Sequence, residues 1–216
     1  MNRRNFSRAL LGSVAGAELL LVGGNAVAQQ AAAIEGKDFK RLDKPLTPSA
    51  PGKIEVLEFF SYGCNACHAL EPQLAAWART LPADVLLRRV PVGFLANAQN
   101  FQRTFFALET MGLVESMQAS IFAAVHVERH PMDKPEQIAA MLGKRGVDAG
   151  KFLATFNSFS AAAFVSRAKK MSSDYGVESI PTLAVQGRFT TSPSQAGGGR
   201  RLFAVLDTLI ERARKG

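Results

Sequence analysis

The sequence predicts an α/β fold, because a βαβ pattern near its start and a ββα pattern at its end enclose a long helical stretch. The first strand is expected at 54–62, where β-branched and aromatic residues form the apolar run "IEVLEFFSY" between two glycines. Apolar residues at helical spacing follow at 65–81, and "VLLRRVPV" supplies a second strand at about 85–91. Strand, helix and strand in this order form a βαβ unit.

The middle of the chain shows helical periodicity and no strand pattern. Strands resume with "PTLAV" and "RFTT" around Gln186-Gly187, a pair that favours a hairpin turn, and an amphipathic helix closes the chain. Residues 29–93 and 176–216 together resemble a thioredoxin fold, a central mixed β-sheet flanked by helices, into which an all-helical domain of residues 94–175 is inserted. The helices of this insertion are expected near 98–111, 113–125, 135–144, 148–157 and 160–175.

Residues 1–28 have the pattern of an export signal. Three of the first eight residues are arginines (Arg3, Arg4 and Arg8), a mostly apolar run extends from Ala9 to Val22, and Ala26 and Ala28 suit cleavage before Gln29. The apolar run is short and contains a glutamate, so it is a poor transmembrane helix, although a retained membrane anchor stays open as an alternative. The "RRNF" stretch resembles a twin-arginine signal, and the Sec route is equally open. We therefore expect a periplasmic protein.

The charge of the chain does not indicate a nucleic-acid partner. The formal net charge is +8 at pH 7, but the basic residues occur singly or in pairs and never in a run of five. Scattered cations are typical of a solvated surface, whereas a nucleic-acid site requires a concentrated basic patch. We expect no nucleic-acid binding.

The two cysteines are the strongest functional signal in the sequence. The chain contains two cysteines, Cys64 and Cys67, at the predicted junction of the first strand and its helix. A disulfide across three positions closes a very small loop and constrains the unfolded chain little, so a structural role is the weaker interpretation. In an exported protein this spacing favours a redox-active pair.

The position of Cys64 at the start of a helix predicts different roles for the two cysteines. Unpaired backbone N–H groups and the helix dipole stabilise negative charge there, so the pKa of the Cys64 thiol should be lowered. We expect Cys64 to be the exposed sulfur that attacks and is attacked. Cys67, one turn into the helix, should face the interior and resolve the mixed disulfide.

The motifs "VLEFFSYGCNAC" and "ESIPTL", separated by a helical insertion, resemble the DsbA family of periplasmic thiol:disulfide oxidoreductases over residues 35–216. The resemblance implies that Pro181 follows a cis peptide bond and faces the cysteines, and that Ile180 tunes specificity and binds an extended substrate through its backbone. It also implies that Glu58 is buried beneath the dithiol and takes the proton of Cys67. An ordinary trans Pro181 and an outward-facing Glu58 on an edge strand are the alternatives.

The resemblance also implies the activity and the partners. The chain should introduce disulfide bonds into unfolded exported proteins, with the Cys64–Cys67 disulfide as its redox group and no bound cofactor or metal. A DsbB-like membrane quinone reductase should reoxidise it, and it should act as a monomer. Tyr62, with Phe94 and Phe189, could line an apolar substrate groove, although these rings suit a core equally well.

One departure from the family concerns the dipeptide between the cysteines. The family usually has Pro-His there, and the histidine stabilises the thiolate, but this chain has Asn65-Ala66. Ala66 cannot supply that stabilisation, so Cys64 should be less acidic and the protein a weaker oxidant than typical members. A role nearer to disulfide isomerase or reductase therefore stays open.

Three other functions remain as alternatives. "CNACH" also matches the attachment signature of c-type haem, with His68 as axial ligand, in an electron-transfer protein. Cys64, Cys67 and His68 could bind zinc, but the remaining histidines, His126 and His130, lie in the predicted insertion, where we expect them at the surface. A chaperone that uses an apolar groove would function without the cysteines.

Overall fold

The computed structural model describes residues 33–216, and the predicted export signal lies outside these residues. Strands and helices follow the order that the sequence predicts, and the helical boundaries differ from the expected ones by one residue or less at most ends. The elements are β1 (Lys40–Arg41), β2 (Ile54–Phe60), α1 (Asn65–Ala78), β3 (Val85–Pro91), α2 (Ala98–Thr110), α3 (Val114–His126), α4 (Pro135–Gly143), α5 (Ala149–Phe156), α6 (Phe159–Asp174), β4 (Thr182–Val185), β5 (Phe189–Thr191) and α7 (Gly199–Arg214).

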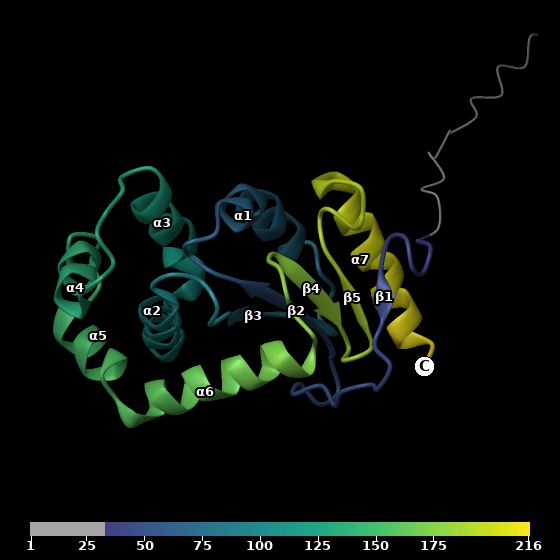
Figure 1. Ribbon diagram of the computed structural model, residues 1–216, viewed down its shortest axis with the longest axis horizontal. Helices are drawn as coiled ribbons and strands as arrows, with labels where there is room; N and C mark the ends of the chain where they lie inside the picture. The colour runs from purple at the N-terminus through teal and green to yellow at the C-terminus, as the bar shows by residue number, and fades with distance from the viewer. Residues whose placement is uncertain (1–32) are drawn as a thin grey trace, which may run out of the picture. The chain divides into compact units, whose positions relative to one another are not determined.

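The strands form a mixed sheet in the order β1-β5-β4-β2-β3 (Figure 1). β2 pairs in parallel with β3 and antiparallel with β4, as expected when a helix connects the first pair and the chain returns through the insertion for the second. All seven residues of β2 are buried, which explains why its sequence is nearly continuously apolar. The predicted α/β class with a mixed sheet is confirmed.

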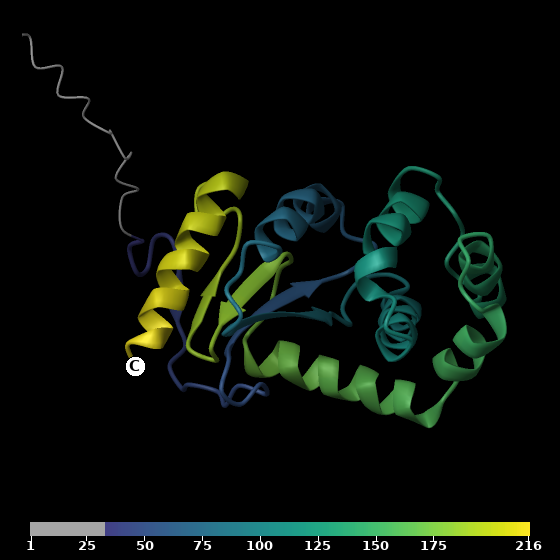
Figure 2. The same ribbon diagram turned by 180° about the vertical axis from the view of Figure 1, so that it is seen from behind.

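Helices cover both faces of the sheet. Val56 of β2 packs in one cluster with residues of α1 and α7, such as Leu74 and Leu206. The next residue, Leu57, points to the opposite face and packs with Ala168 of α6. This alternation is the period of a strand, and it produces a helix–sheet–helix arrangement (Figures 1 and 2).

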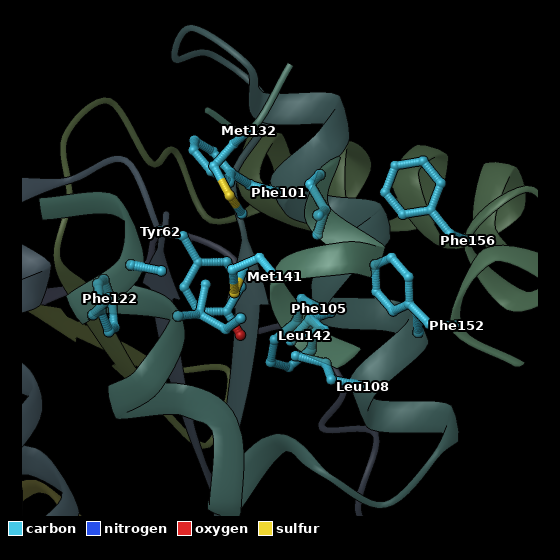
Figure 3. Packing of buried hydrophobic residues seen from close by; sticks show 14 of the residues in the cluster. Tyr62, Phe101, Phe105, Leu108, Phe122, Met132, Met141, Leu142, Phe152 and Phe156 are labelled. Carbon is cyan, nitrogen blue, oxygen red and sulfur yellow. The ribbon is translucent and has the colours of Figure 1, made fainter. Parts of the chain in front are cut away.

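All the helices between β3 and β4 belong to the interval that the sequence predicts to be helical. Their buried side chains form a separate core, shown in Figure 3, that includes Phe105, Phe122 and Phe152. Phe60 and Tyr62, at the end of β2 and just after it, pack into this core together with both cysteines. The dithiol therefore lies where the sheet meets the helical insertion.

The register of β4 places Pro181 beside the end of β2. Thr182 pairs with Phe59, so the residue before it lies next to the segment that leads to the cysteines. The β4–β5 turn, Gln186-Gly187, has positive φ at both residues (53° and 62°), as the predicted hairpin requires. A side chain at Gly187 would collide with the backbone carbonyl of Leu46, so this position requires glycine.

Candidate active site

The dithiol stands at the junction of β2 and α1. The chain leaves β2 at Phe60, turns through three residues in which the Cys64 N–H donates to the Ser61 carbonyl at 3.1 Å, and enters α1 with Cys64 as its N-cap. Cys64 and Cys67 are joined by a disulfide. The strand–turn–helix context that the sequence predicts for the pair is confirmed.

The two sulfurs have different surroundings. The Cys64 Sγ accepts a hydrogen bond from the Cys67 backbone N–H at 3.1 Å, so it occupies the place of an N-capping oxygen. A thiolate at that position would be stabilised by the same N–H and by the helix dipole. Cys64 is 9 % exposed and Cys67 is 0 % exposed. The expected order of exposure is therefore present, although Cys64 exposes less of its surface than the sequence suggested.

The Ile180-Pro181 peptide bond is cis, as the resemblance implies. The Ile180 carbonyl oxygen lies 3.8 Å from the Cys64 Sγ, so the segment before β4 faces the disulfide directly. Ile180 is half-buried, and its backbone precedes a strand whose first residue is paired with β2. The two sequence motifs, although far apart in the chain, thus meet at one point.

A groove of about 410 Å³ begins at this point. It lies between α1, the cis-proline segment and the loop that precedes α7, and its walls are mostly small or apolar side chains. The residues that line it include Ala66, Ala69, Leu70, Ile180, Pro181 and Pro193. The small side chain of Ala66 opens the groove right beside the disulfide.

Tyr62 does not line a groove, which corrects the sequence-based prediction. Its side chain is 0 % exposed, its ring packs edge-on against Phe60, and its hydroxyl donates to the Gln118 Oε1 of α3 at 2.8 Å. Figure 3 shows the ring among the side chains of the helical core. Phe189 is also buried, whereas Phe94 is exposed. A ring that follows a buried strand could not be assigned to core or surface from sequence alone, because both environments accept tyrosine.

Glu58 is fully buried in the central strand β2, so an outward-facing glutamate on an edge strand is wrong. Its Oε2 accepts a hydrogen bond from the Arg89 Nε at 3.1 Å. Arg89, itself nearly buried on β3, also binds the carboxylates of Glu71 and Glu115, each at 3.1 Å. One cation thus holds three carboxylates that come from β2, α1 and α3.

Burial dominates the ionisation of this cluster. Loss of hydration raises the pKa of Glu58 to about 7, although the charge of Arg89 acts in the opposite direction. Burial likewise raises the pKa of Glu71, again against Arg89. A carboxyl group with a pKa close to neutral can both take up and release a proton at physiological pH.

We predict that Glu58→Gln stabilises the oxidised protein at alkaline pH. Because the pKa of Glu58 is higher in the folded state than in the unfolded state, the wild type loses stability as the pH rises from about 4.5 to 7. Glutamine has the shape of the glutamate side chain but cannot ionise. The free energy of unfolding of Glu58→Gln should therefore exceed that of the wild type by almost nothing at pH 4.5 and by about 2–3 kcal/mol at pH 8. Urea unfolding at both pH values measures it. Glu115→Gln is the control, because Glu115 binds the same arginine but its side chain is 87 % exposed. An equal gain in folding stability for Glu115→Gln at pH 8 would contradict the prediction.

Sequence reasoning missed three residues of this region: Arg89, Glu71 and His126. The signal for the first two was present, since an arginine in an apolar strand and a glutamate on the buried face of α1 both need a partner. His126 lies at a helix end, as expected, and is half-buried, but the sequence did not predict its contact with the segment of the cysteines. Its ring stacks on that of His68 with centroids 4.8 Å apart. Nothing in the local sequence indicates this contact, because it depends on how α3 packs against α1.

The arrangement of the cysteines and histidines does not favour the zinc and haem alternatives. Within residues 33–216, no three histidine, cysteine, aspartate or glutamate side chains are gathered as a metal ion requires. The rings of His68 and His126 are parallel within 8°, so their nitrogens do not converge on one point. In the disulfide, the sulfurs of Cys64 and Cys67 are engaged with each other rather than available as ligands.

The fold and the site define a thioredoxin-fold thiol:disulfide oxidoreductase with a helical insertion, because a helix-capping Cys-x-x-Cys disulfide faces a cis proline across a mixed sheet. A sequence model described as "DSBA-like thioredoxin domain" matches residues 81–209. The chain therefore belongs to this DsbA family.

Relatives and solved structures agree with that assignment. The chain is 38 % identical to the thiol:disulfide interchange protein DsbA of Pseudomonas aeruginosa over 83 % of this chain and 85 % of the relative, and 36 % identical to that of Burkholderia cepacia over 89 % and 91 %. The crystal structure of Pseudomonas aeruginosa DsbA superposes with a TM-score of 0.81 over 85 % of this chain and 95 % of that one, at 38 % identity. The protein is thus a thiol:disulfide oxidoreductase whose redox group is the Cys64–Cys67 disulfide.

Proposed function

We propose that Cys64 is the sulfur at which substrates react and that Cys67 is the resolving sulfur. A substrate thiolate attacks the Cys64 Sγ, the bond to Cys67 breaks, and Cys67 leaves with the electron pair. The second substrate thiolate then attacks the substrate sulfur of the mixed disulfide and releases Cys64 as a thiolate. The substrate loses two electrons and gains a disulfide, and the enzyme ends as the dithiol. The observation that carries this assignment is the hydrogen bond from the Cys67 N–H to the Cys64 Sγ at 3.1 Å.

Glu58 is proposed to exchange the proton of Cys67. When the disulfide is regenerated, the Cys67 thiol must lose its proton before it attacks, and it is fully buried. Glu58 is buried in the strand that leads to the dithiol, and its raised pKa suits a proton acceptor at neutral pH. Burial raises that pKa, the charge of Arg89 opposes the rise, and the charge of Glu71 adds to it.

The substrate is proposed to bind as an extended segment along Ile180 and Pro181. The Ile180 carbonyl is close enough to the disulfide to accept a backbone hydrogen bond from a residue beside the reacting cysteine. The groove lined by Ala66 and Pro181 would take an apolar side chain of an unfolded protein. Such recognition depends on the backbone and on one hydrophobic contact, so it suits many substrates.

The proposed location of the protein is the periplasm. Residues 1–28 would export the chain to the periplasm, where it acts as a monomer on unfolded exported proteins and is reoxidised by a DsbB-like membrane quinone reductase. The disulfide would be its only redox group, with no bound cofactor. No helix within residues 33–216 has the length and apolar character that a membrane span requires.

The test is the reaction of the oxidised mature chain with a reduced, unfolded protein that contains two cysteines. One substrate disulfide should form per enzyme disulfide consumed, and turnover should require membranes that contain the quinone reductase. If no substrate disulfide forms, the proposed direction of electron flow is wrong.

A reductase or isomerase role is the second candidate, and Asn65-Ala66 is the observation that favours it. Without an imidazole between the cysteines, the reduced form has one stabilising group fewer. A redox titration against glutathione decides between the two roles. A potential near that of thioredoxin, about −270 mV, would assign the protein to the reductases.

A further inference from the structure

Two histidines form a stacked pair beside the dithiol that the proposed mechanism does not use. His68, on α1, and His126, at the end of α3, have parallel rings with centroids 4.8 Å apart. The Phe122 ring lies beside both, with its centroid 5.7 Å from that of His68 and 6.1 Å from that of His126. Figures 1 and 2 show α1 and α3 as neighbours in both views. The pair thus connects the thioredoxin part of the chain to the helical insertion at the active site.

His126 also holds the turn that leads to the cysteines. Its Nε2–H donates to the Tyr62 carbonyl at 2.8 Å; because a carbonyl can only accept, this nitrogen carries the hydrogen. Tyr62 is two residues before Cys64, and His68 directly follows Cys67. His126 therefore contacts the chain on both sides of the Cys64–Cys67 segment.

The backbone ties this pair closely to the reacting sulfur. The His68 N–H donates to the Cys64 carbonyl at 3.0 Å, so the two residues are one helical turn apart on the same face of α1. Cys64, Cys67, Tyr62 and Phe122 also pack in the same apolar cluster, where charges are weakly screened. A charge on either imidazole and a charge on Cys64 should therefore influence each other.

Within residues 33–216, no carboxylate is bonded to His126 that would compete with this interaction. From α1 the facing titratable group is His68, and from the turn the contact is the neutral Tyr62 carbonyl. In its own segment the nearest carboxylate, Glu128, is bound by Arg145, and Arg129 and His130 follow it. Burial and His68 lower the pKa of His126, while the hydrogen bond to Tyr62 raises it. Reduction of the disulfide adds the missing anion, the Cys64 thiolate.

We propose that His126 is a positioning residue of the dithiol whose protonation is coupled to the redox state. It fixes the turn before Cys64, and it holds a proton more tightly once Cys64 is a thiolate. The inference rests on Cys64 being the sulfur that carries charge, as proposed above. By reciprocity, a proton on His126 favours the reduced enzyme and makes the disulfide a stronger oxidant in mild acid.

The direct test is an NMR titration of the histidine Hε1 resonances in the oxidised and the reduced wild-type protein between pH 5 and 8. The chain has three histidines, so single variants assign all three signals. The midpoint of His126 should rise on reduction by about half a pH unit, a roughly three-fold gain in proton affinity, and that of His130 should stay constant. A His126 midpoint that is equal in both states, or lower in the reduced one, overturns the proposal.

The second test compares equilibrium constants with glutathione for wild type, His126→Gln and the control His130→Gln. Glutamine can still donate to the Tyr62 carbonyl but cannot ionise. The constant for reduction should match the wild type at pH 8 and fall below it in His126→Gln at lower pH, approaching a roughly three-fold difference where His126 is protonated in both redox states. An equal change at pH 8 and at lower pH would mean a purely structural role and overturn the coupling. Wild-type protein that oxidises substrate without a His126 shift refutes this inference alone, whereas wild-type protein that oxidises no substrate refutes the proposed function.

Discussion

Cys67→Ser should be trapped as a mixed disulfide, whereas Cys64→Ser should not. Both variants lack the disulfide, so both should lose substrate oxidation by at least about a thousandfold. Their remaining thiols differ, however. Cys64 keeps its place at the helix N-terminus, with the N–H of residue 67 directed at the sulfur, and it retains a path to solvent. In Cys64→Ser the remaining thiol is Cys67, which is fully buried.

Oxidised glutathione provides the measurement. The Cys64 thiolate of Cys67→Ser attacks one glutathione sulfur, releases the other as glutathione, and stays modified because no second cysteine can displace it. Mass spectrometry at pH 7 should show complete addition of one glutathione to Cys67→Ser while Cys64→Ser is largely unmodified. Circular dichroism of both variants controls for folding. Faster modification of Cys64→Ser would reverse the assigned roles.

The fold could be predicted from local patterns because each element carries its own periodicity. The β2 run "IEVLEFF" carries apolar residues on both faces, which indicates a central strand, and all of it is buried. The helix ends of the insertion coincide with glycines such as Gly112 and Gly176, both with positive φ. The position of the cysteines at a strand–helix junction followed from these boundaries.

The surroundings of the dithiol could not be predicted in the same way. Tyr62 and His126 take their places from the packing of α3 against α1, and no local pattern fixes that contact. The partner of Glu58 is Arg89 on the neighbouring strand, in direct register with it. A parallel pairing of β2 and β3 predicts that some residues of these strands meet, but the register that brings Arg89 opposite Glu58 appears only in the assembled sheet.

Removal of Arg89, the arginine at the centre of the acidic cluster, should cost a large part of the folding stability. Arg89→Met leaves the carboxylates of Glu58 and Glu71 buried without a cation, and such a loss costs about 3–5 kcal/mol of folding stability. Glu115 contributes little to this loss of stability, because its exposed carboxylate can be hydrated by solvent when the arginine is absent. Arg89→Lys keeps the positive charge but lacks the planar guanidinium whose three nitrogens bind the three carboxylates. Its loss of folding stability should therefore be clearly smaller than that of Arg89→Met.

The pH dependence of this loss identifies its cause. Without Arg89 the pKa of Glu58 should rise further, since the charge of that arginine lowers it in the wild type. At pH 5 both buried carboxyls can be protonated, and the loss should fall to under about 2 kcal/mol, whereas at pH 8 it should be complete. Adding Glu58→Gln to Arg89→Met should recover part of the folding stability at pH 8, because it removes one of the unpaired charges. Urea unfolding of the wild type, the two single variants and the double variant measures the coupling between the two residues. If the loss is the same at pH 5 and pH 8, Arg89 acts through packing rather than through the charge of Glu58, and its role in setting the pKa of that carboxyl would be refuted.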